Sequence, residues 1–449
     1  MMILSLLLAA VFYASPVHFE VILAGNFGEP RPNHFHGGLD IKTQQVEGKA
    51  IYSIGDGYVS RVTVNLDGMG NAIYVRHPEG YTSVYAHLQR FSPMIEAKLR
   101  KWQYDHHSTD ADVTFNATDC PVAKGQVIAL SGDTGASMGP HLHLEIHQTD
   151  NWNVLDPLEF IPELVQDTVA PVAHSFMAYP QDKEGIFCGK TTAQRFEFTT
   201  NELEEEFTAW GKVGFGLYAH DYMQGSSNTC GIRHTCLLVD GMEVFSSNVS
   251  NIPVADNKQV NIWGDLDYFI QHQQWFLKSY LEPGNTLPFL KVNKNRGIVN
   301  FDQERTYHVK YILQDFFGNM SEYGFTVRGA RELIPDDLPS DSVEQLPEET
   351  LLPVEEKELT LRIIPLNQRQ WNTEHILLFD IRGPQSEPFT FEGFIDDQFI
   401  LFDHVKKSSR IICDLRQTPV APTGTEHVLH VKARDNSGRE AEFEAPLLY

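Results

Sequence analysis

Short runs of alternating apolar and polar residues, separated by glycine-containing turns, recur along most of this 449-residue chain. Successive side chains of a β-strand point to opposite faces, so such alternation gives each strand one face for the core and one for solvent. The pattern is clearest in the N-terminal part, in the segments Ile51–Ile54, Gly57–Val64, Ala72–His77, Ser83–Leu88, Val127–Ser131 and His141–His147. We therefore expect a mainly β fold that begins with an antiparallel β domain.

One segment of this first domain has a different period. Between Pro93 and Tyr104, the residues Ile95, Leu99 and Trp102 recur at helical spacing, and the polar stretch DHHSTDAD follows. This predicts an inserted helix followed by a loop. The histidines of the loop lie among aspartates, which permits a second metal site, but a solvated loop is the interpretation that we favour.

The length of the chain exceeds what one core normally supports, so we expect several domains. Farther along, strand-like runs carry hairpin signals such as Val239-Asp240-Gly241-Met242, which predicts a tight two-residue turn. An acidic, proline-rich stretch is typical of a linker. We expect the first β domain at 16–165, a β-sandwich (Ig-like) domain at 166–330, the linker at 331–358 and a second β-sandwich domain at 359–449.

The net charge and the cysteine content limit the kinds of molecule that this chain is expected to bind and the cross-links that it is expected to form. A formal net charge of −25 repels phosphate backbones, and no basic stretch rich in aromatic residues offsets it, which argues against nucleic-acid binding. The five cysteines form no C-x-x-C pair. Cys230 and Cys236 either bridge a hairpin or remain buried free thiols, and we favour free thiols.

Residues 2–14, MILSLLLAAVFYA, form an apolar run with the length of a signal-peptide core, too short to span a bilayer. We expect a signal peptide at 1–15 and export to the periplasm or cell envelope; the alternative is a buried first strand or helix. No other apolar stretch reaches transmembrane length, so we expect no transmembrane span.

The segment from His141 to Ile146, HLHLEI, carries the first sign of chemistry. Strand alternation sends His141, His143 and Glu145 to one face, so two imidazoles share one surface. A catalytic zinc ion needs three protein ligands and an open position, and imidazole nitrogens are suitable ligands. One histidine of the pair can therefore bind a metal while the other stands beside it.

Further donors occur in two earlier segments. The sequence His36-Gly37-Gly38-Leu39-Asp40 offers an imidazole and a carboxylate, and its glycines allow the backbone to bend near an ion. His87 ends the run SVYAH, whose alternation places it on the face of Ser83 and Tyr85. Each of these pieces alone is weak evidence, because a lone strand histidine is more often structural.

Taken together and in this order, H-x-G-x-D, Y-x-H-L and T-G-x-S-x-G-P-H-L-H, the segments resemble the LytM and lysostaphin-type zinc metallopeptidases of bacterial cell walls, over roughly residues 25–160. The resemblance implies one zinc ion per chain, bound by His36, Asp40 and His143. It also implies that His87 and His141 are catalytic histidines that do not bind the metal.

The expected activity follows from this chemistry. Zinc can lower the pKa of a bound water to roughly 7 and polarise a peptide carbonyl. No H-E-x-x-H motif supplies a glutamate base, so His87 and His141 are expected to share proton transfer and oxyanion stabilisation. We expect a zinc metalloendopeptidase that hydrolyses the peptide cross-links or stem peptides of peptidoglycan.

Some features depart from the family pattern and keep alternatives open. The stretch from Phe91 to Cys120 is long and is expected to roof part of the groove, and Arg31 and Asn33 stand where some members have a tyrosine. One alternative is a catalytically silent LytM-like module that binds or activates other cell-wall hydrolases; a cupin-like enzyme is another. The sandwich domains are expected to bind glycan or an envelope partner, or to space the catalytic domain.

Overall fold

A computed structural model describes residues 13–331, 360–383, 389–405, 409–435 and 437–449. Residues 1–12 of the expected signal peptide and residues 332–358 of the expected linker lie outside the described residues. Contacts between Cα atoms divide the described chain into two compact units. Unit 1 contains residues 13–42, 76–84 and 143–331, and unit 2 contains residues 43–75, 85–142 and 360–449.

The mainly β fold is confirmed, and in unit 1 it begins with the strands that carry the HGGLD and HLHLEI motifs. Strands β1, β4, β13 and β8 are neighbours in this order within one sheet. The ends of two strands belong to unit 2, namely residues 85–86 of β8 and residues 141–142 of β13. Short strands and one 3-10 helix complete this part of unit 1. The bounds are β1 Leu23–Gly25, β2 Pro30–Arg31, β3 His34–Phe35, β4 Gly38–Lys42, β8 Tyr81–Ala86, β13 His141–Gln148, β14 Val154–Leu155 and η1 Pro157–Glu159.

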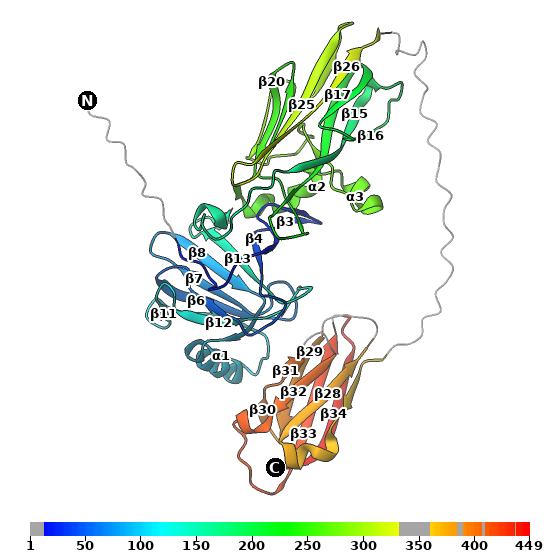
Figure 1. The fold of residues 1–449 in the computed structure, drawn as a ribbon. Helices are drawn as coiled ribbons and strands as arrows, with labels where there is room; N and C mark the ends of the chain where they lie inside the picture. The colour runs from blue at the N-terminus through cyan, green and yellow to red at the C-terminus, as the bar shows by residue number, and fades with distance from the viewer. Residues whose placement is uncertain (1–12, 332–359, 384–388, 406–408, 436) are drawn as a thin grey trace, which may run out of the picture. The chain divides into compact units, whose positions relative to one another are not determined.

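The rest of unit 1 is a β-sandwich-like domain built on long strands, of which β15 and β17 pair antiparallel and β17 and β26 pair parallel. Figure 1 shows β15, β17 and β26 side by side in its main sheet, whose strand order is β16-β15-β17-β26-β25-β19-β20-β23. The bounds of the strands are β15 Val172–Phe187, β16 Gln194–Glu197, β17 Glu202–Tyr222, β18 Thr229–Cys230, β19 His234–Val239, β20 Met242–Asn248, β21 Asn251–Ile252, β22 Leu277–Lys278, β23 Leu290–Val292, β24 Val299–Phe301, β25 Thr306–Gln314 and β26 Met320–Gly329. The helices are η2 Val254–Gln259, α2 Val260–Trp263 and α3 Leu266–His272.

The predicted two-residue hairpin is confirmed between β19 and β20. The first strand ends at Val239 and the second begins at Met242. Asp240 and Gly241 both have positive φ, of 52° and 76°. Two central residues in the left-handed region are what a type I′ turn requires, and such a turn matches the twist of the paired strands.

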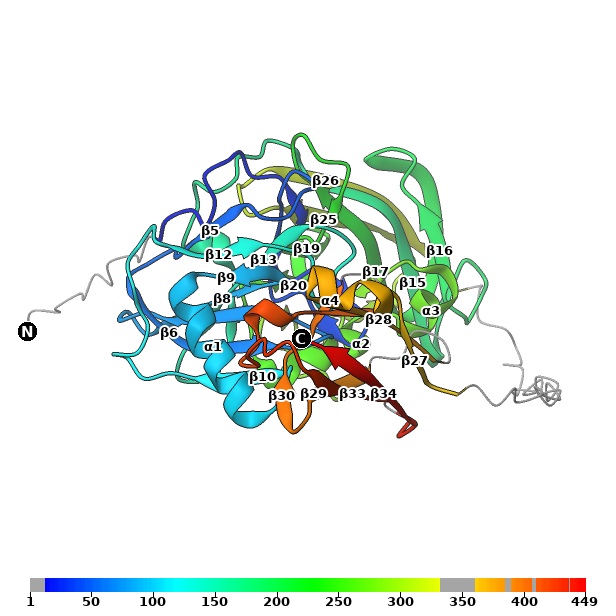
Figure 2. The same ribbon diagram turned by 90° about the horizontal axis from the view of Figure 1, so that it is seen from below.

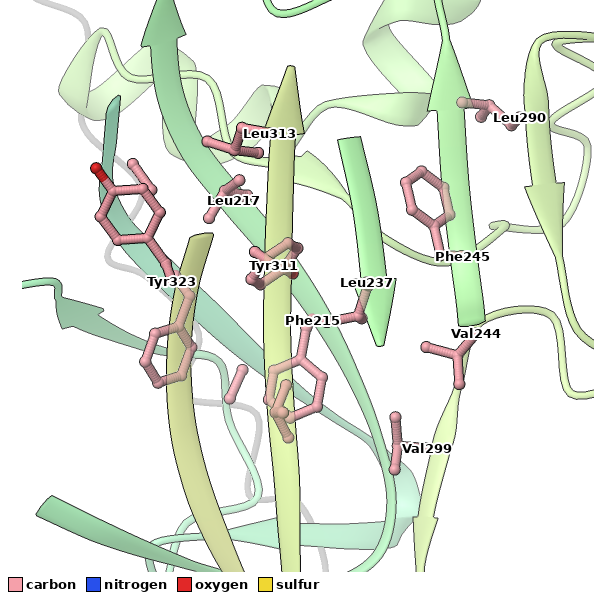
Figure 3. Close-up of a cluster of buried hydrophobic side chains, with 14 of the residues drawn as sticks. Phe215, Leu217, Leu237, Val244, Phe245, Leu290, Val299, Tyr311, Leu313 and Tyr323 are labelled. Carbon is pink, nitrogen blue, oxygen red and sulfur yellow. The ribbon is translucent and has the colours of Figure 1, made fainter. Parts of the chain in front are cut away.

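The sandwich and the motif-bearing strands of unit 1 share one hydrophobic core. Phe215, Tyr311 and Tyr323 project from three strands of the sandwich into this core (Figure 3). Phe27 and Phe35, from the segment around the HGGLD motif, are buried in the same cluster. The two parts of unit 1 are therefore expected to fold together, and the domain boundary placed at residue 165 stays a prediction.

Unit 2 contains the predicted inserted helix. Helix α1 spans Pro93–His106, with Pro93 at its first position and Ile95 and Leu99 buried, as the spacing predicts. A three-stranded sheet has the order β5-β12-β9, and β7, β6 and β10 are neighbours in another sheet. The bounds are β5 Ala50–Tyr52, β6 Gly57–Val64, β7 Ala72–Arg76, β9 Leu88–Phe91, β10 Ala111–Thr114, β11 Pro121–Val122 and β12 Val127–Ser131.

Residues 360–449 form two four-stranded sheets around a core of their own, β27-β28-β32-β31 and β30-β29-β33-β34. Strands β29, β33 and β34 lie next to one another in Figure 2. This agrees with the second sandwich expected from the sequence. The bounds are β27 Arg362–Pro365, η4 Gln368–Gln370, α4 Trp371–Glu374, β28 Ile376–Arg382, β29 Phe389–Ile395, β30 Gln398–Ile400, β31 Asp403–Val405, β32 Arg410–Asp414, η5 Leu415–Gln417, β33 Glu426–Asp435 and β34 Glu440–Leu448.

Two further findings concern the cysteines and the helices. All five cysteines are free thiols, so Cys230 and Cys236 do not bridge a hairpin. Among the described helices, none combines the length and the apolar character needed to cross a membrane.

A buried ion pair links the motif-bearing segment of unit 1 to the sandwich. Arg233 donates to Asp156 at 2.6 Å and to Glu159 at 2.5 Å, and the side chains of Arg233 and Asp156 are 16% and 5% exposed. Burial raises the pKa of Asp156 to about 6, although the charge of Arg233 opposes the shift. Ionisation of Asp156 at neutral pH therefore costs desolvation free energy, and the charge of Arg233 offsets part of this cost.

We predict that Arg233→Met lowers the free energy of unfolding at pH 7 by about 3 kcal/mol, because it leaves the Asp156 carboxylate buried without a cation. Below pH 6 the folded chain protonates Asp156, so the loss should shrink between pH 7 and pH 5. Urea unfolding at both pH values measures this, with Arg76→Met as an exposed control. Equal losses at both pH values would contradict the prediction.

Candidate metal centre

Three of the predicted site residues meet in unit 1. His36 follows β3, Asp40 lies in β4, and His143 lies in the neighbouring strand β13. The Nδ1 atom of His143 lies 2.8 Å from Oδ1 of Asp40 and 3.1 Å from Nε2 of His36. All three residues are buried, with 2% to 7% of their surface exposed. Two imidazole nitrogens and one carboxylate oxygen therefore converge on one point.

The glycines of the HGGLD motif serve close packing. Neither Gly37 nor Gly38 has a positive φ, so they are not needed for an unusual backbone bend. A Cβ atom on Gly38 would overlap the carbonyl of Leu144, and one on Gly37 would overlap the carboxylate of Glu145. The absence of side chains lets β4 approach β13 closely enough for Asp40 to reach His143.

Second partners orient both histidines. His36 donates from Nδ1 to the backbone carbonyl of Asn26 at 2.6 Å, and His143 donates from Nε2 to Oε1 of Glu145 at 3.0 Å. Each ring thus directs its other nitrogen, Nε2 of His36 and Nδ1 of His143, toward Asp40. Glu145 is itself held by Nε2 of His147 at 2.6 Å. Such carboxylate and carbonyl partners are typical of metal-binding histidines.

The charges of the site are balanced by one proton. Burial lowers the pKa of His36, which keeps this imidazole neutral. Burial also disfavours charge on His143, but its hydrogen bonds to Asp40 and Glu145 outweigh burial and raise the pKa to about 9. Burial would raise the pKa of Glu145, yet the two histidines hold it well below its ordinary value. A metal ion that binds here at neutral pH must therefore displace a proton from His143.

Arg31 is a part of this site that the motifs do not reveal. Its guanidinium donates to Oδ2 of Asp40 at 2.8 Å and is also paired with Glu29. This contact uses one oxygen of Asp40 and leaves the other, Oδ1, directed toward His36 and His143. Arg31 therefore fixes the orientation of the carboxylate.

The other two predicted residues, His87 and His141, lie in unit 2 and contact each other, with ring centroids 4.6 Å apart. His87 donates from Nδ1 to the carbonyl of Thr134, and His141 does so to the carbonyl of Gly139, both at 2.8 Å. A neutral imidazole that donates from Nδ1 carries its lone pair on Nε2. The structure therefore brings the pair together in the same tautomer.

One detail of this pair differs from the strand that we expected over Ser83–Leu88. Strand β8 ends at Ala86, and His87 has a φ of 57°, in the left-handed region that side chains other than glycine seldom adopt. Simple alternation therefore does not set the direction of His87. Such a conformation persists only where surrounding contacts hold it, and it is common at functional sites.

Within the described residues, two groups of side chains have the closeness needed for metal binding. One is the set His36, Asp40 and His143. The other is formed by Asp167, Asp221 and Asp315. Neither includes the two histidines of the predicted loop, His106 and His107; His106 ends helix α1 and His107 caps it, so the loop begins later than the sequence predicted.

The cluster of two histidines and one aspartate is typical of metallopeptidases. Comparison with known proteins identifies the peptidase family that the N-terminal part of the chain resembles. Residues 34–104 match the family model described as Peptidase family M23. The resemblance to LytM and lysostaphin-type peptidases is thereby confirmed.

Two curated relatives and one solved structure are also similar to part of this chain. An "Uncharacterized metalloprotease" of Haemophilus influenzae is 33% identical over 29% of this chain and 21% of the relative, and the "Peptidoglycan DD-endopeptidase ShyC" of Vibrio cholerae is 33% identical over 30% and 26%. A zinc-containing peptidase from Vibrio cholerae of known structure is 27% identical over 32% of this chain and 39% of that chain, with a TM-score of 0.24. The chain spans about a quarter of the length of these curated relatives.

We predict that Glu145→Gln weakens zinc binding by about 10 to 100-fold, the usual cost of losing a partner of a metal-binding histidine. The substitution keeps the shape of the side chain but removes the charge that orients His143. Competition with a chromogenic chelator measures the affinity. Glu163→Gln, at an exposed position of the same unit, should bind zinc like the unmodified chain. Unchanged affinity in Glu145→Gln would rule out this orienting role.

Proposed function

We propose that this chain is a zinc metalloendopeptidase that hydrolyses peptide cross-links or stem peptides of bacterial peptidoglycan. The observation that carries the proposal is the convergence of His36, Asp40 and His143, with a separate partner for each donor. The names of the curated relatives support the substrate class, since they include peptidoglycan DD-endopeptidases.

The donor set fits one zinc ion. Two imidazole nitrogens and a carboxylate oxygen are the ligands of many catalytic zinc sites, and donor atoms around a tetrahedral zinc are about 3.3 Å apart. The separations here, 2.8 to 3.1 Å, are only slightly shorter. When bound, zinc supplies a Lewis acid that polarises a peptide carbonyl and acidifies a water molecule.

The remaining chemistry falls to the chain's own side chains. His87 and His141 each donate from Nδ1 to a backbone carbonyl, which holds the rings and makes Nε2 the atom that accepts or returns a proton. We assign them proton transfer and stabilisation of the developing oxyanion. His36, Asp40 and His143 hold the metal, while Glu145 and Arg31 orient these ligands.

A second candidate function is a silent module that regulates other cell-wall hydrolases. That function needs no complete set of ligands, whereas all five motif positions are present in this chain. We therefore favour the enzyme. Export to the periplasm or envelope, and contacts of the two sandwich domains with glycan or an envelope partner, complete the proposal.

Substitutions should separate metal binding from proton transfer. Replacing His36, Asp40 or His143 by Ala is expected to remove zinc and activity together. His87→Ala and His141→Ala should keep one zinc per chain and lose roughly 100-fold in turnover, because each removes only a positioned acid or base. Metal analysis and peptide-cleavage rates measure both effects, with the exposed His272→Ala as a control. Loss of zinc in His141→Ala, with retention in His143→Ala, would reverse the two assignments.

Digestion of purified sacculi tests the substrate. We expect the zinc-loaded chain to release muropeptides with new amino termini, which mass spectrometry identifies and which define the bond that is cleaved. The His143→Ala variant should release none. Zinc binding without release of any new amino terminus would favour the silent module.

A further inference from the structure

The second metal-capable cluster lies in unit 1 and is built from residues far apart in the sequence. Asp167 precedes β15, Asp221 lies near the end of β17, and Asp315 directly follows β25. One carboxylate oxygen from each lies within 4.8 Å of the others. The residues are only 7%, 2% and 4% exposed. Three acidic groups are thus withdrawn from water at one point.

Hydrogen bonds satisfy only part of this cluster. Oδ1 of Asp167 accepts from the backbone N–H groups of Thr168, Val169 and Gln224, and Asp315 accepts twice from Asn319. By contrast, Oδ2 of Asp167 and Oδ1 of Asp221 are buried without any hydrogen-bond partner. A buried oxygen of this kind is costly unless it has a ligand.

No protein cation offsets these charges. In the described part of the chain, none of the three carboxylates is paired with a lysine, arginine or histidine. Burial, together with the neighbouring charges of Asp315 and Asp167, raises the pKa of Asp221 to about 8. Burial also raises the pKa of Asp315. The folded chain therefore meets a strong electrostatic penalty at this point, which a bound cation would remove.

A proton is the other way to relieve this charge. Because the pKa of Asp221 is raised to about 8, the ligand-free chain holds a proton there at neutral pH, and a cation that binds must displace it. The geometry that favours a cation is the presence of two buried oxygens without a partner, one on Asp167 and one on Asp221.

We propose that Asp167, Asp221 and Asp315 bind a calcium ion, separate from the zinc centre. Calcium takes six to eight oxygen ligands at about 2.3 to 2.6 Å, whereas magnesium usually keeps several waters and uses only one or two carboxylates. Three buried carboxylates that meet at one point therefore suit calcium better. Carboxylates on three separate segments also suit the flexible coordination of calcium.

The position of this site indicates that the bound ion would stabilise the junction between segments of unit 1. Asp167 belongs to the segment that enters the sandwich, whereas Asp221 and Asp315 belong to the sandwich itself. Asp221 also lines a small cavity of about 10 Å³ together with Asn26 and Asp156, from the part of unit 1 that carries the zinc motifs. Calcium would tie these segments together where they meet.

The test uses the full chain, treated with EGTA and then reloaded with zinc. We expect equilibrium dialysis to find about one calcium ion per chain, and saturating calcium to raise the melting temperature by about 5 °C. Asp221→Asn and Asp315→Asn should lose both effects. Above pH 8, where Asp221 is ionised in the calcium-free chain, Asp221→Asn should melt no lower than the unmodified chain, because it removes one of three repelling charges.

Two controls make the result specific. Asp182→Asn changes an exposed carboxylate of β15, and His143→Ala removes a zinc ligand; both should keep the calcium response. Absence of calcium binding by the unmodified chain would overturn the proposal, and so would an equal response to magnesium or an unchanged response in Asp221→Asn. If Asp221→Asn does not fold, the unmodified chain and Asp315→Asn decide the question.

Discussion

The hydrogen bonds that hold His143 between two buried carboxylates are the interaction on which the metal centre depends. Asp40 faces one ring nitrogen of His143, and Glu145 accepts from the other. Because both carboxylates are withdrawn from water, the geometry of the ring is fixed before any ligand arrives. The close approach of β4 to β13, which Gly38 permits, makes the arrangement possible.

Buried negative charge is the constraint that the two candidate metal sites share. At the candidate zinc centre, the charges of Asp40 and Glu145 are balanced by a proton on His143 and by Arg31. At the cluster around Asp221, no lysine, arginine or histidine among the described residues pairs with the carboxylates, and the pKa of Asp221 is raised instead. Both sites therefore favour a bound cation, but their ligand atoms differ. The nitrogen and oxygen atoms of His36, Asp40 and His143 suit zinc, whereas the carboxylate oxygens around Asp221 suit calcium.

The sandwich of unit 1 contacts the residues of the candidate metal centre. The side-chain amide of Asn26 forms reciprocal hydrogen bonds with the backbone of Gly231 in the sandwich, and the backbone carbonyl of Asn26 accepts from Nδ1 of His36. Phe35, next to His36, packs against Trp263 and Phe289 of the sandwich. A change in the sandwich can therefore reach His36, a candidate metal ligand, through Asn26 alone.

Local patterns determined much of this protein from sequence alone. Alternation predicted strands such as β6 and β12, apolar spacing predicted helix α1, and Asp240-Gly241 predicted the hairpin turn, because each depends on neighbouring residues. The ordered motifs also predicted which side chains form the candidate site. Only the tertiary structure decided the left-handed backbone of His87, the contact of Arg31 with Asp40 and the meeting of Asp221 with Asp315. These features depend on contacts between segments distant in sequence, whose energies no local pattern records.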